Sequence, residues 1–294
     1  GTRGQVIIPL SEDAADRLQR GLPVNYAQRK SSYMPEAAGI AYSRVNQGAE
    51  TGRPPVVLIH GAGSSHLFWP GEFRRMAGWD VYALDLPGRG RSGGAARQSV
   101  GEVARQVLEW MKALGMFRAA LVGHSLGGAV ALQLALEHPD RAAALALLCS
   151  AAFFDVPPLF LDLLDNQKMP EPALNWLSER LVQADTPEAV KERVLADVRK
   201  VRQGLLIADW RACARFDCRS RLNRCYVHTW AAAGKRDRLL TPAAVSGLRA
   251  LPNAAVQLYP AAGHLLPLEQ PQHCAADVQR FLRTCLDSAE KPSG

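Results

Sequence analysis

Short apolar runs alternate with longer amphipathic stretches along most of the chain beyond residue 38. Apolar runs that lack polar alternation are typical of strands that helices cover on both faces of a parallel sheet. We therefore predict an edge strand at residues 39–45 and further strands at 56–59, 80–84, 119–122, 144–148, 226–230 and 256–259.

A helix is clearly indicated between the strands at 80–84 and 119–122. Ser99 and Glu102 form a capping box, which satisfies free backbone N–H groups of the first turn. Apolar residues then recur at helical spacing: Val100, Val103, Ala104, Val107, Leu108, Met111 and Leu114. Strand–helix alternation of this kind predicts an α/β fold with a doubly wound, mostly parallel sheet, which binds ligands beyond the carboxyl ends of its strands.

Two segments depart from this alternation. Residues 1–32 are predicted to form a separate N-terminal arm. Residues 153–216 contain helical segments punctuated by prolines and no strand-like run, which is far more chain than a crossover between parallel strands needs. We predict that residues 33–152 and 217–294 together form the core, and that residues 153–216 are a helical insert above the carboxyl edge of the sheet.

Composition narrows the class of protein. The 294 residues are 48% hydrophobic and 21% charged, which is ordinary for a globular protein with a large core. The net charge of +7 arises from 28 Arg and 7 Lys that are scattered along the whole chain. Because these cations form neither a clustered basic face nor a known reader motif, we expect no nucleic-acid partner.

Cysteine usage and hydropathy bear on the compartment. The six cysteines include no Cys-x-x-Cys pair, so we expect free, mostly buried thiols in place of a zinc site or disulfides. No apolar stretch approaches the roughly 20 residues that cross a bilayer. We expect a cytoplasmic protein without an integral membrane segment, and secretion stays open because the chain does not begin with Met.

The strongest chemical signal is the segment Gly-His-Ser-Leu-Gly-Gly at residues 123–128. It lies directly after a strand-like run and directly before a helix-like run, which is the context of a nucleophile elbow. Such a turn strains the backbone of Ser125, and Gly123 and Gly127 lack the Cβ atoms that would collide with it. Ser125 is therefore predicted to be the attacking nucleophile, with the N–H of Leu126 facing the developing oxyanion.

A second glycine-containing segment, His60-Gly61-Ala62-Gly63, also follows a predicted strand. Acyl transfer passes through a tetrahedral oxyanion that needs two preorganised donors. Because the two glycines leave this backbone bare, we expect the N–H of Ala62 to be one donor and that of Leu126 the other. His60 precedes the nucleophile in the chain, and we interpret it as a structural hydrogen-bonding residue.

Two more strand ends carry candidates for a triad. Asp237 follows the predicted strand at 226–230, and His264 follows the predicted strand at 256–259. A carboxylate at a strand end can orient an imidazole, and a histidine in a loop can act as the general base. The chain order Ser125, Asp237, His264 is the order expected for a triad on an α/β sheet.

From about residue 56 to residue 286, the chain resembles the α/β-hydrolase family. The motifs that carry the resemblance are HGAG at 60–63, DLPGRGRS at 85–92, GHSLGG at 123–128, GKRDRLLTP at 234–242 and AAGHLLPLEQP at 261–271. The resemblance implies that residues 85–92 form a structural turn. It also implies that residues 153–216 are the family's helical cap, inserted after the sixth strand of the fold. A GHSLGG motif combined with such a cap is most similar to carboxylesterases of small molecules.

Serine at position 125 narrows the chemistry. Members of the family that open epoxides or displace halide use a carboxylate there, because an ester intermediate can be hydrolysed and a seryl ether cannot. We predict a hydrolase of small-molecule carboxylic esters that forms an acyl-enzyme. The alternatives are a C–C (diketone) hydrolase, a lactonase or thioesterase on the same triad, and a non-catalytic ligand-binding protein. The sequence contains no metal-binding cluster and no dinucleotide or flavin motif, so we expect no cofactor.

Apolar residues predict the character of the substrate pocket. The residues that we expect to line it flank the reacting serine or belong to the insert: Gly61, Gly63, His66, Phe153, Phe154, Trp176, Trp210 and Leu265. Burial of an acyl chain gains roughly 0.8 kcal/mol per methylene. We therefore expect a preference for uncharged esters with short-to-medium apolar acyl groups.

Overall fold

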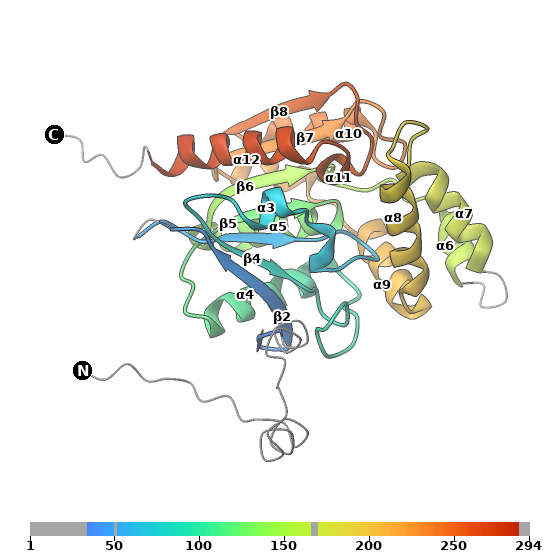
Figure 1. Ribbon diagram of the computed structural model, residues 1–294, viewed down its shortest axis with the longest axis horizontal. Helices are drawn as coiled ribbons and strands as arrows, with labels where there is room; N and C mark the ends of the chain where they lie inside the picture. The colour runs from blue at the N-terminus through green and yellow to red at the C-terminus, as the bar shows by residue number, and fades with distance from the viewer. Residues whose placement is uncertain (1–33, 50–51, 166–169, 288–294) are drawn as a thin grey trace, which may run out of the picture. The chain divides into compact units, whose positions relative to one another are not determined.

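Eight strands form a single sheet in the part of the chain that the computed structural model describes, residues 34–49, 52–165 and 170–287 (Figure 1). The predicted N-terminal arm at residues 1–32 lies outside these described residues. The strands are β1 (Glu36–Ala37), β2 (Ile40–Asn46), β3 (Val56–Ile59), β4 (Asp80–Leu84), β5 (Ala119–His124), β6 (Ala142–Leu148), β7 (Thr229–Gly234) and β8 (Ala254–Tyr259).

The sheet is parallel except at one edge. Its strand order is β1-β2-β4-β3-β5-β6-β7-β8, with β2 antiparallel to β4 and every neighbouring pair from β4 to β8 parallel. All residues of β3, β5 and β6 are buried, since helices cover both faces of the sheet, and these strands therefore lack polar alternation. The predicted α/β fold with a doubly wound, mostly parallel sheet is confirmed.

The core helices pack in pairs on the two faces. They are α3 (Gly71–Arg74), α4 (Val100–Ala113), α5 (Leu126–Glu137), α10 (Pro242–Ser246), α11 (Leu266–Glu269) and α12 (Pro271–Leu286), with short 3-10 helices η1 (His66–Phe68), η2 (Pro139–Arg141), η3 (Arg219–Arg224) and η4 (Gly247–Ala250). Helix α4 packs against α5, and α3 packs against α12. The predicted capping of α4 is present, because Ser99 Oγ accepts the Glu102 N–H at 3.3 Å and Glu102 Oε2 accepts the Gln98 N–H at 3.0 Å.

Where the structure describes the chain between β6 and β7, it contains four helices: α6 (Pro158–Asp165), α7 (Pro170–Leu181), α8 (Glu188–Lys200) and α9 (Gln203–Ala214). They gather at one end of the sheet, at the right of Figure 1. The two ends of the insert are joined at its base, where Phe153 forms a β-bridge with Asp217 and the Cys218 N–H donates to Ala152 O at 2.8 Å. The inserted segment therefore leaves the core and returns to it at the same place, beside the sheet.

The predicted bounds of most strands agree with the structure to within two residues, and two predictions differ more substantially. Strand β2 is not at the edge, because the two-residue strand β1 pairs outside it. Strand β7 begins at Thr229, three residues later than predicted, and includes Ala231–Ala233, whereas Tyr226 precedes it and is 68% exposed. Alanine has little intrinsic preference for strands, but this run pairs with β6 on one side and β8 on the other, and such packing outweighs propensity.

All six cysteines are free, and all except the partly exposed Cys285 are buried. Over the three described ranges, no helix is both long enough and apolar enough to cross a membrane.

Candidate active site

Ser125 lies in the tight turn between β5 and α5. Its backbone φ is 52° and its ψ is −119°, a region that a residue with a Cβ atom rarely adopts. The turn is held by backbone hydrogen bonds, from Ser125 N to Leu148 O at 2.9 Å and from Gly128 N to Ser125 O at 2.9 Å. This geometry brings the Ser125 side chain to the wall of two neighbouring cavities.

The two motif glycines are required for different reasons. A Cβ atom on Gly123 would lie 2.3 Å from Gly127 O, within the turn itself. A Cβ atom on Gly127 would instead lie 2.1 Å from Ile59 O, at the end of β3. The expectation that Gly127 avoids the nucleophile's own backbone is therefore corrected: this glycine lets the first turn of α5 approach the neighbouring strand.

Asp237 and His264 meet in the loops that follow β7 and β8. His264 Nδ1 lies 2.8 Å from Asp237 Oδ2, and both side chains are buried. Asp237 Oδ1 accepts the N–H groups of Leu239 at 2.9 Å and Leu240 at 2.8 Å. The two backbone N–H groups hold the carboxylate in position, and its other oxygen accepts a hydrogen bond from His264. The proton of His264 is then held at Nδ1, and Nε2 is left to exchange a proton with a reacting group.

The loop that carries His264 is held at two backbone positions. His124 Nε2 lies 2.8 Å from His264 O, and burial keeps the pKa of His124 well below its ordinary value. His124 is therefore a neutral donor through Nε2–H. On the other side, the Gly263 N–H donates to Glu269 Oε2 at 2.6 Å, while burial raises the pKa of Glu269. Together these bonds restrict how the imidazole of His264 can move.

The segment at residues 60–63 lies directly against the serine. A Cβ atom on Gly61 would be 3.2 Å from Ser125 Cβ. Within the described part of the chain, the N–H groups of Ala62 and Leu126 donate no hydrogen bond. Ala62 lines the larger cavity beside Ser125, and Leu126 directly follows Ser125 at the start of α5. His60 does not face a ligand: its Nδ1–H donates to Gly61 O at 2.8 Å, and its Nε2 accepts the Leu86 N–H at 3.0 Å.

Ser125 and His264 line two cavities that lie between the core and the insert. The larger cavity, of about 50 Å³, includes Gly61, Gly63 and Leu265 in its wall. The smaller cavity, of about 20 Å³, includes Phe154 and Trp176, and Trp210 lines both. Six of the eight residues predicted for the pocket are thus at these two cavities. Ser125 Oγ forms no hydrogen bond with a described residue, so no described side chain or backbone group competes with a ligand for this hydroxyl.

Two predicted pocket residues lie elsewhere. His66 is not among the residues that line these two cavities; its backbone N–H and its Nδ1 both contact Asp85 Oδ1, at 2.7 and 2.9 Å. Phe153 instead stacks under the guanidinium of Arg219, whose carbon lies 4.1 Å from the ring centroid. His66 was predicted to face the pocket because it closely follows residues 60–63, and Phe153 because it begins the insert. In the structure, neither side chain is among those that line the two cavities.

Helix α8 lines part of the larger cavity. The sequence does not predict this contribution of α8. Arg193, Val194, Asp197 and Val198 all line it, at positions that share one face of a helix. Because α8 is mostly charged, its composition is typical of a solvated helix. The pair Val194 and Val198, four residues apart, is the signal that could have identified the buried face.

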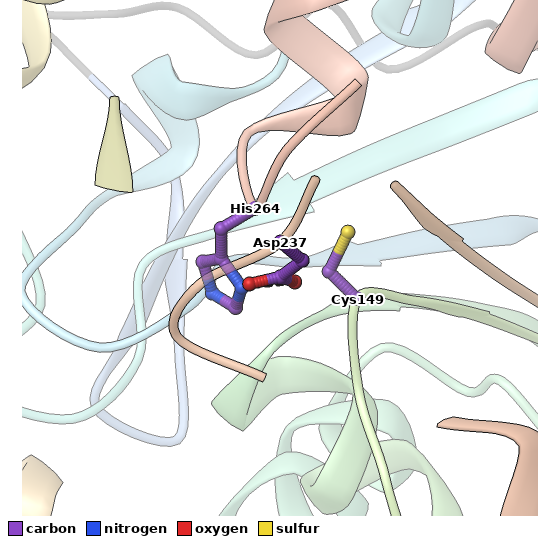
Figure 2. A group of neighbouring side chains, drawn as sticks. All are labelled: Cys149, Asp237 and His264. Atoms are coloured by element: carbon purple, nitrogen blue, oxygen red, sulfur yellow. Dashed lines mark hydrogen bonds and ion pairs between the residues drawn. The ribbon is translucent and has the colours of Figure 1, made fainter. Parts of the chain in front are cut away.

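Figure 2 shows Cys149 beside Asp237 and His264, with possible ligand atoms of the three within 4.8 Å of one another. Two ligands of a tetrahedral zinc ion lie roughly 3.3 Å apart or more, but Nδ1 and Oδ2 are 2.8 Å apart and share a hydrogen bond. Burial raises the pKa of the Cys149 thiol well above its ordinary value, and its Sγ lies 3.6 Å from Gly263 O as a donor. The group is suited to holding a proton and poorly suited to holding a metal ion.

Comparisons with known proteins agree with this fold. Residues 54–209 match the family model described as the alpha/beta hydrolase fold. The chain is similar to RutD of Caulobacter sp. (strain K31), a protein named as a carbamate hydrolase, at 30% identity over 274 residues, which cover 82% of this chain and 95% of that one. A solved structure of a thermophilic esterase is similar at 27% identity, with a TM-score of 0.70, over 86% of this chain and 97% of that one.

A longer relative matches as well. The chain is 32% identical over 252 residues to the dihydrolipoyllysine-residue acetyltransferase component of the acetoin cleaving system of Pseudomonas putida. The match covers 79% of this chain but only 64% of that relative's length.

Proposed function

Because the chain belongs to the alpha/beta hydrolase fold family, we propose that it is a serine hydrolase that cleaves carboxylic esters of small molecules through an acyl-enzyme. The observation that carries the proposal is the convergence of three features around Ser125 and His264, which line the same two cavities. These are the strained Ser125, the Asp237–His264 pair at 2.8 Å, and two free backbone N–H groups.

The residues have separate roles in the proposed reaction. Ser125 Oγ attacks the ester carbonyl carbon, and His264 Nε2 takes the hydroxyl proton while Asp237 stabilises the imidazolium. The N–H groups of Ala62 and Leu126 stabilise the oxyanion. Collapse of this intermediate breaks the bond to the alcohol, which leaves with the proton from His264. A water molecule, activated by the same imidazole, then releases the acid and restores Ser125.

We further propose that residues 153–216 act as a cap that selects the substrate. Helices α7, α8 and α9 each contribute side chains to the cavity that contains Ser125, for example Leu177, Val194 and Trp210. The small cavities and these apolar walls support short, uncharged acyl groups as the preferred substrates.

Carbamate cleavage is a second candidate, favoured by the full-length similarity to a protein named as a carbamate hydrolase. A carbamate carbonyl would pass through the same kind of tetrahedral oxyanion, so the residues and their roles would be unchanged. Parallel assays with a carboxylic ester and a carbamate that share one alcohol separate the two candidates.

The direct test combines activity-based labelling with substitution of the serine. A fluorophosphonate should label the wild-type protein at Ser125, and Ser125→Ala should abolish both labelling and ester turnover, with kcat lower by on the order of 10⁴ to 10⁶. Thermal unfolding of the variant should match wild type. Near-normal turnover by Ser125→Ala, or labelling at another residue, would contradict the proposed mechanism.

A further inference from the structure

A carboxylate from the helices inserted between β6 and β7 hydrogen-bonds to the segment at residues 60–63, which contains Ala62. Asp209, on α9, is 1% exposed, and its Oδ2 accepts the Gly63 N–H at 2.9 Å. The same oxygen accepts Arg89 Nε at 3.2 Å, and Asp209 Oδ1 pairs with the Arg89 guanidinium. Arg89, which lies in the turn after β4, is 2% exposed. Although burial lowers the pKa of Arg89 to about 10, the guanidinium remains protonated at neutral pH.

Stability alone is a weak explanation for this buried ion pair. Well-packed apolar residues of similar volume often replace such a pair without loss of stability, because both charges must be stripped of water. An apolar pair could not, however, accept the Gly63 N–H. Leu206, one turn before Asp209 on α9, also presses on this glycine: a Cβ atom on Gly63 would lie 2.9 Å from Leu206 Cδ1. The same face of α9 therefore restricts Gly63 both by packing and by a hydrogen bond.

The bond to Gly63 completes a pair of backbone restraints around Ala62. The peptide plane before Ala62, which contains its N–H, is held by the bond from His60 Nδ1–H to Gly61 O at 2.8 Å. The peptide plane after Ala62, which contains the Gly63 N–H, is held by Asp209. Gly63 has a φ of 63°, a conformation that glycine adopts freely. An unrestrained glycine here could therefore rotate and carry the Ala62 N–H away from Ser125.

We propose that Asp209 is a positioning residue, which aims the Ala62 N–H at the oxyanion by holding the next peptide plane from the insert. Arg89 holds the carboxylate in place through the buried ion pair. This inference rests on the proposed function, since it assumes that Ala62 is an oxyanion donor. It implies that the oxyanion site is complete only when α9 is docked on the core.

The test separates the hydrogen-bond acceptor from the ion pair with two double variants. Arg89→Met/Asp209→Leu removes the charges and the acceptor, whereas Arg89→Gln/Asp209→Asn removes the charges and keeps an acceptor for Gly63. We expect similar thermal unfolding temperatures for both. For the apolar variant, kcat should fall on the order of 10²-fold with little change in KM, as for loss of an oxyanion donor. The polar variant should lose less than tenfold.

Two further measurements exclude a merely structural role. Affinity for a trifluoromethyl ketone, which forms an oxyanion adduct with the serine, should fall in parallel with kcat/KM in the apolar variant only. Asp165→Asn is the matched control, because Asp165 on α6 forms an exposed ion pair, at 2.6 Å, with Arg211, which lies on α9 like Asp209. This variant should leave the affinity for the ketone and kcat/KM unchanged. Equal kcat for the two double variants would overturn the proposal.

If the apolar double variant does not fold, the single variants Asp209→Asn and Asp209→Leu decide the question at a temperature where both are folded. Both lose the ion pair, and only Asn retains an acceptor, so equal losses of kcat would again overturn the proposal. Failure of the proposed function has a different outcome, because the wild type would then neither hydrolyse esters nor react with a fluorophosphonate.

Discussion

At the scale of single residues, three histidines near the serine differ in chemistry because their partners differ. His264 faces a carboxylate through Nδ1. The hydrogen bonds of His60 and His124 are to backbone groups, and burial lowers the pKa of His60 to about 4 and that of His124 well below its ordinary value. These two are therefore neutral structural residues at physiological pH, and in the proposed reaction His264 is the imidazole that exchanges protons.

The Asp237 carboxylate should accordingly matter far more than the thiol beside it. We expect Asp237→Asn to lower kcat for ester hydrolysis by roughly 10³- to 10⁴-fold, because the amide would favour the wrong tautomer of His264. Cys149→Ala is the control from the same cluster, and it should change kcat by less than about tenfold, since the protonated thiol faces a carbonyl. A comparable loss in both variants would show that the sulfur takes part in the reaction.

At the scale of elements, an aromatic cluster in the insert shapes the two cavities. Phe160 of α6 stacks on Trp176 of α7, with ring centroids 4.2 Å apart, and meets Trp210 of α9 edge-on at 4.9 Å. Trp210 lines both cavities, whereas Trp176 lines only the smaller of the two. If the proposed function holds, the position of the Trp210 ring limits the length of acyl group that fits beside Ser125.

Removal of this ring should lengthen the preferred substrate. Across p-nitrophenyl esters, we expect kcat/KM of the wild type to rise about fourfold per methylene, from roughly 0.8 kcal/mol each, and then to drop at a short chain length. Trp210→Ala should shift the optimum to longer chains, and Trp176→Ala should shift it less. Leu159→Ala, at a 67% exposed position on α6, should leave the profile unchanged. A flat wild-type profile would argue against selection by the insert.

At the scale of the whole molecule, buried neutral histidines couple the fold to pH. The pKa of His60 is about 4 in the folded protein, against about 6.5 in an unfolded chain. The folded state thus binds this proton less tightly than the unfolded chain does. The contribution of His60 to the free energy of unfolding is therefore complete above about pH 6.5 and is lost as pH falls toward 4. The shift corresponds to about 3 kcal/mol in total, and His124 acts in the same direction.

Urea unfolding at pH 7 and pH 4.5 measures this coupling. The free energy of unfolding of the wild type should fall between the two, and His60→Gln should show a clearly smaller fall, even if it is less stable at pH 7. His273→Gln, at an exposed position on α12, should retain the wild-type pH dependence. An unchanged fall in His60→Gln would indicate that His60 is not the responsible group.

The sequence by itself determined the class of fold, the elbow around Ser125, and the approximate positions of the strands and of the inserted helices. These features depend on local physics: apolar periodicity, the capping box at Ser99, and the need for glycine where backbones touch, as at Gly123. Strand β7 shows the limit of such patterns, because Ala231–Ala233 becomes a strand only through pairing with its neighbours.

Only the tertiary structure decided which side chains face the serine and which support its surroundings. The polar helix α8 supplies part of the cavity wall, whereas His66 faces Asp85 in place of the cavity. Asp209 is separated from Gly63 by 146 residues and from Arg89 by 120, and no local pattern links a carboxylate to a backbone N–H over such distances. These contacts exist because the insert folds back onto the sheet, where a buried polar group is stable only with a partner.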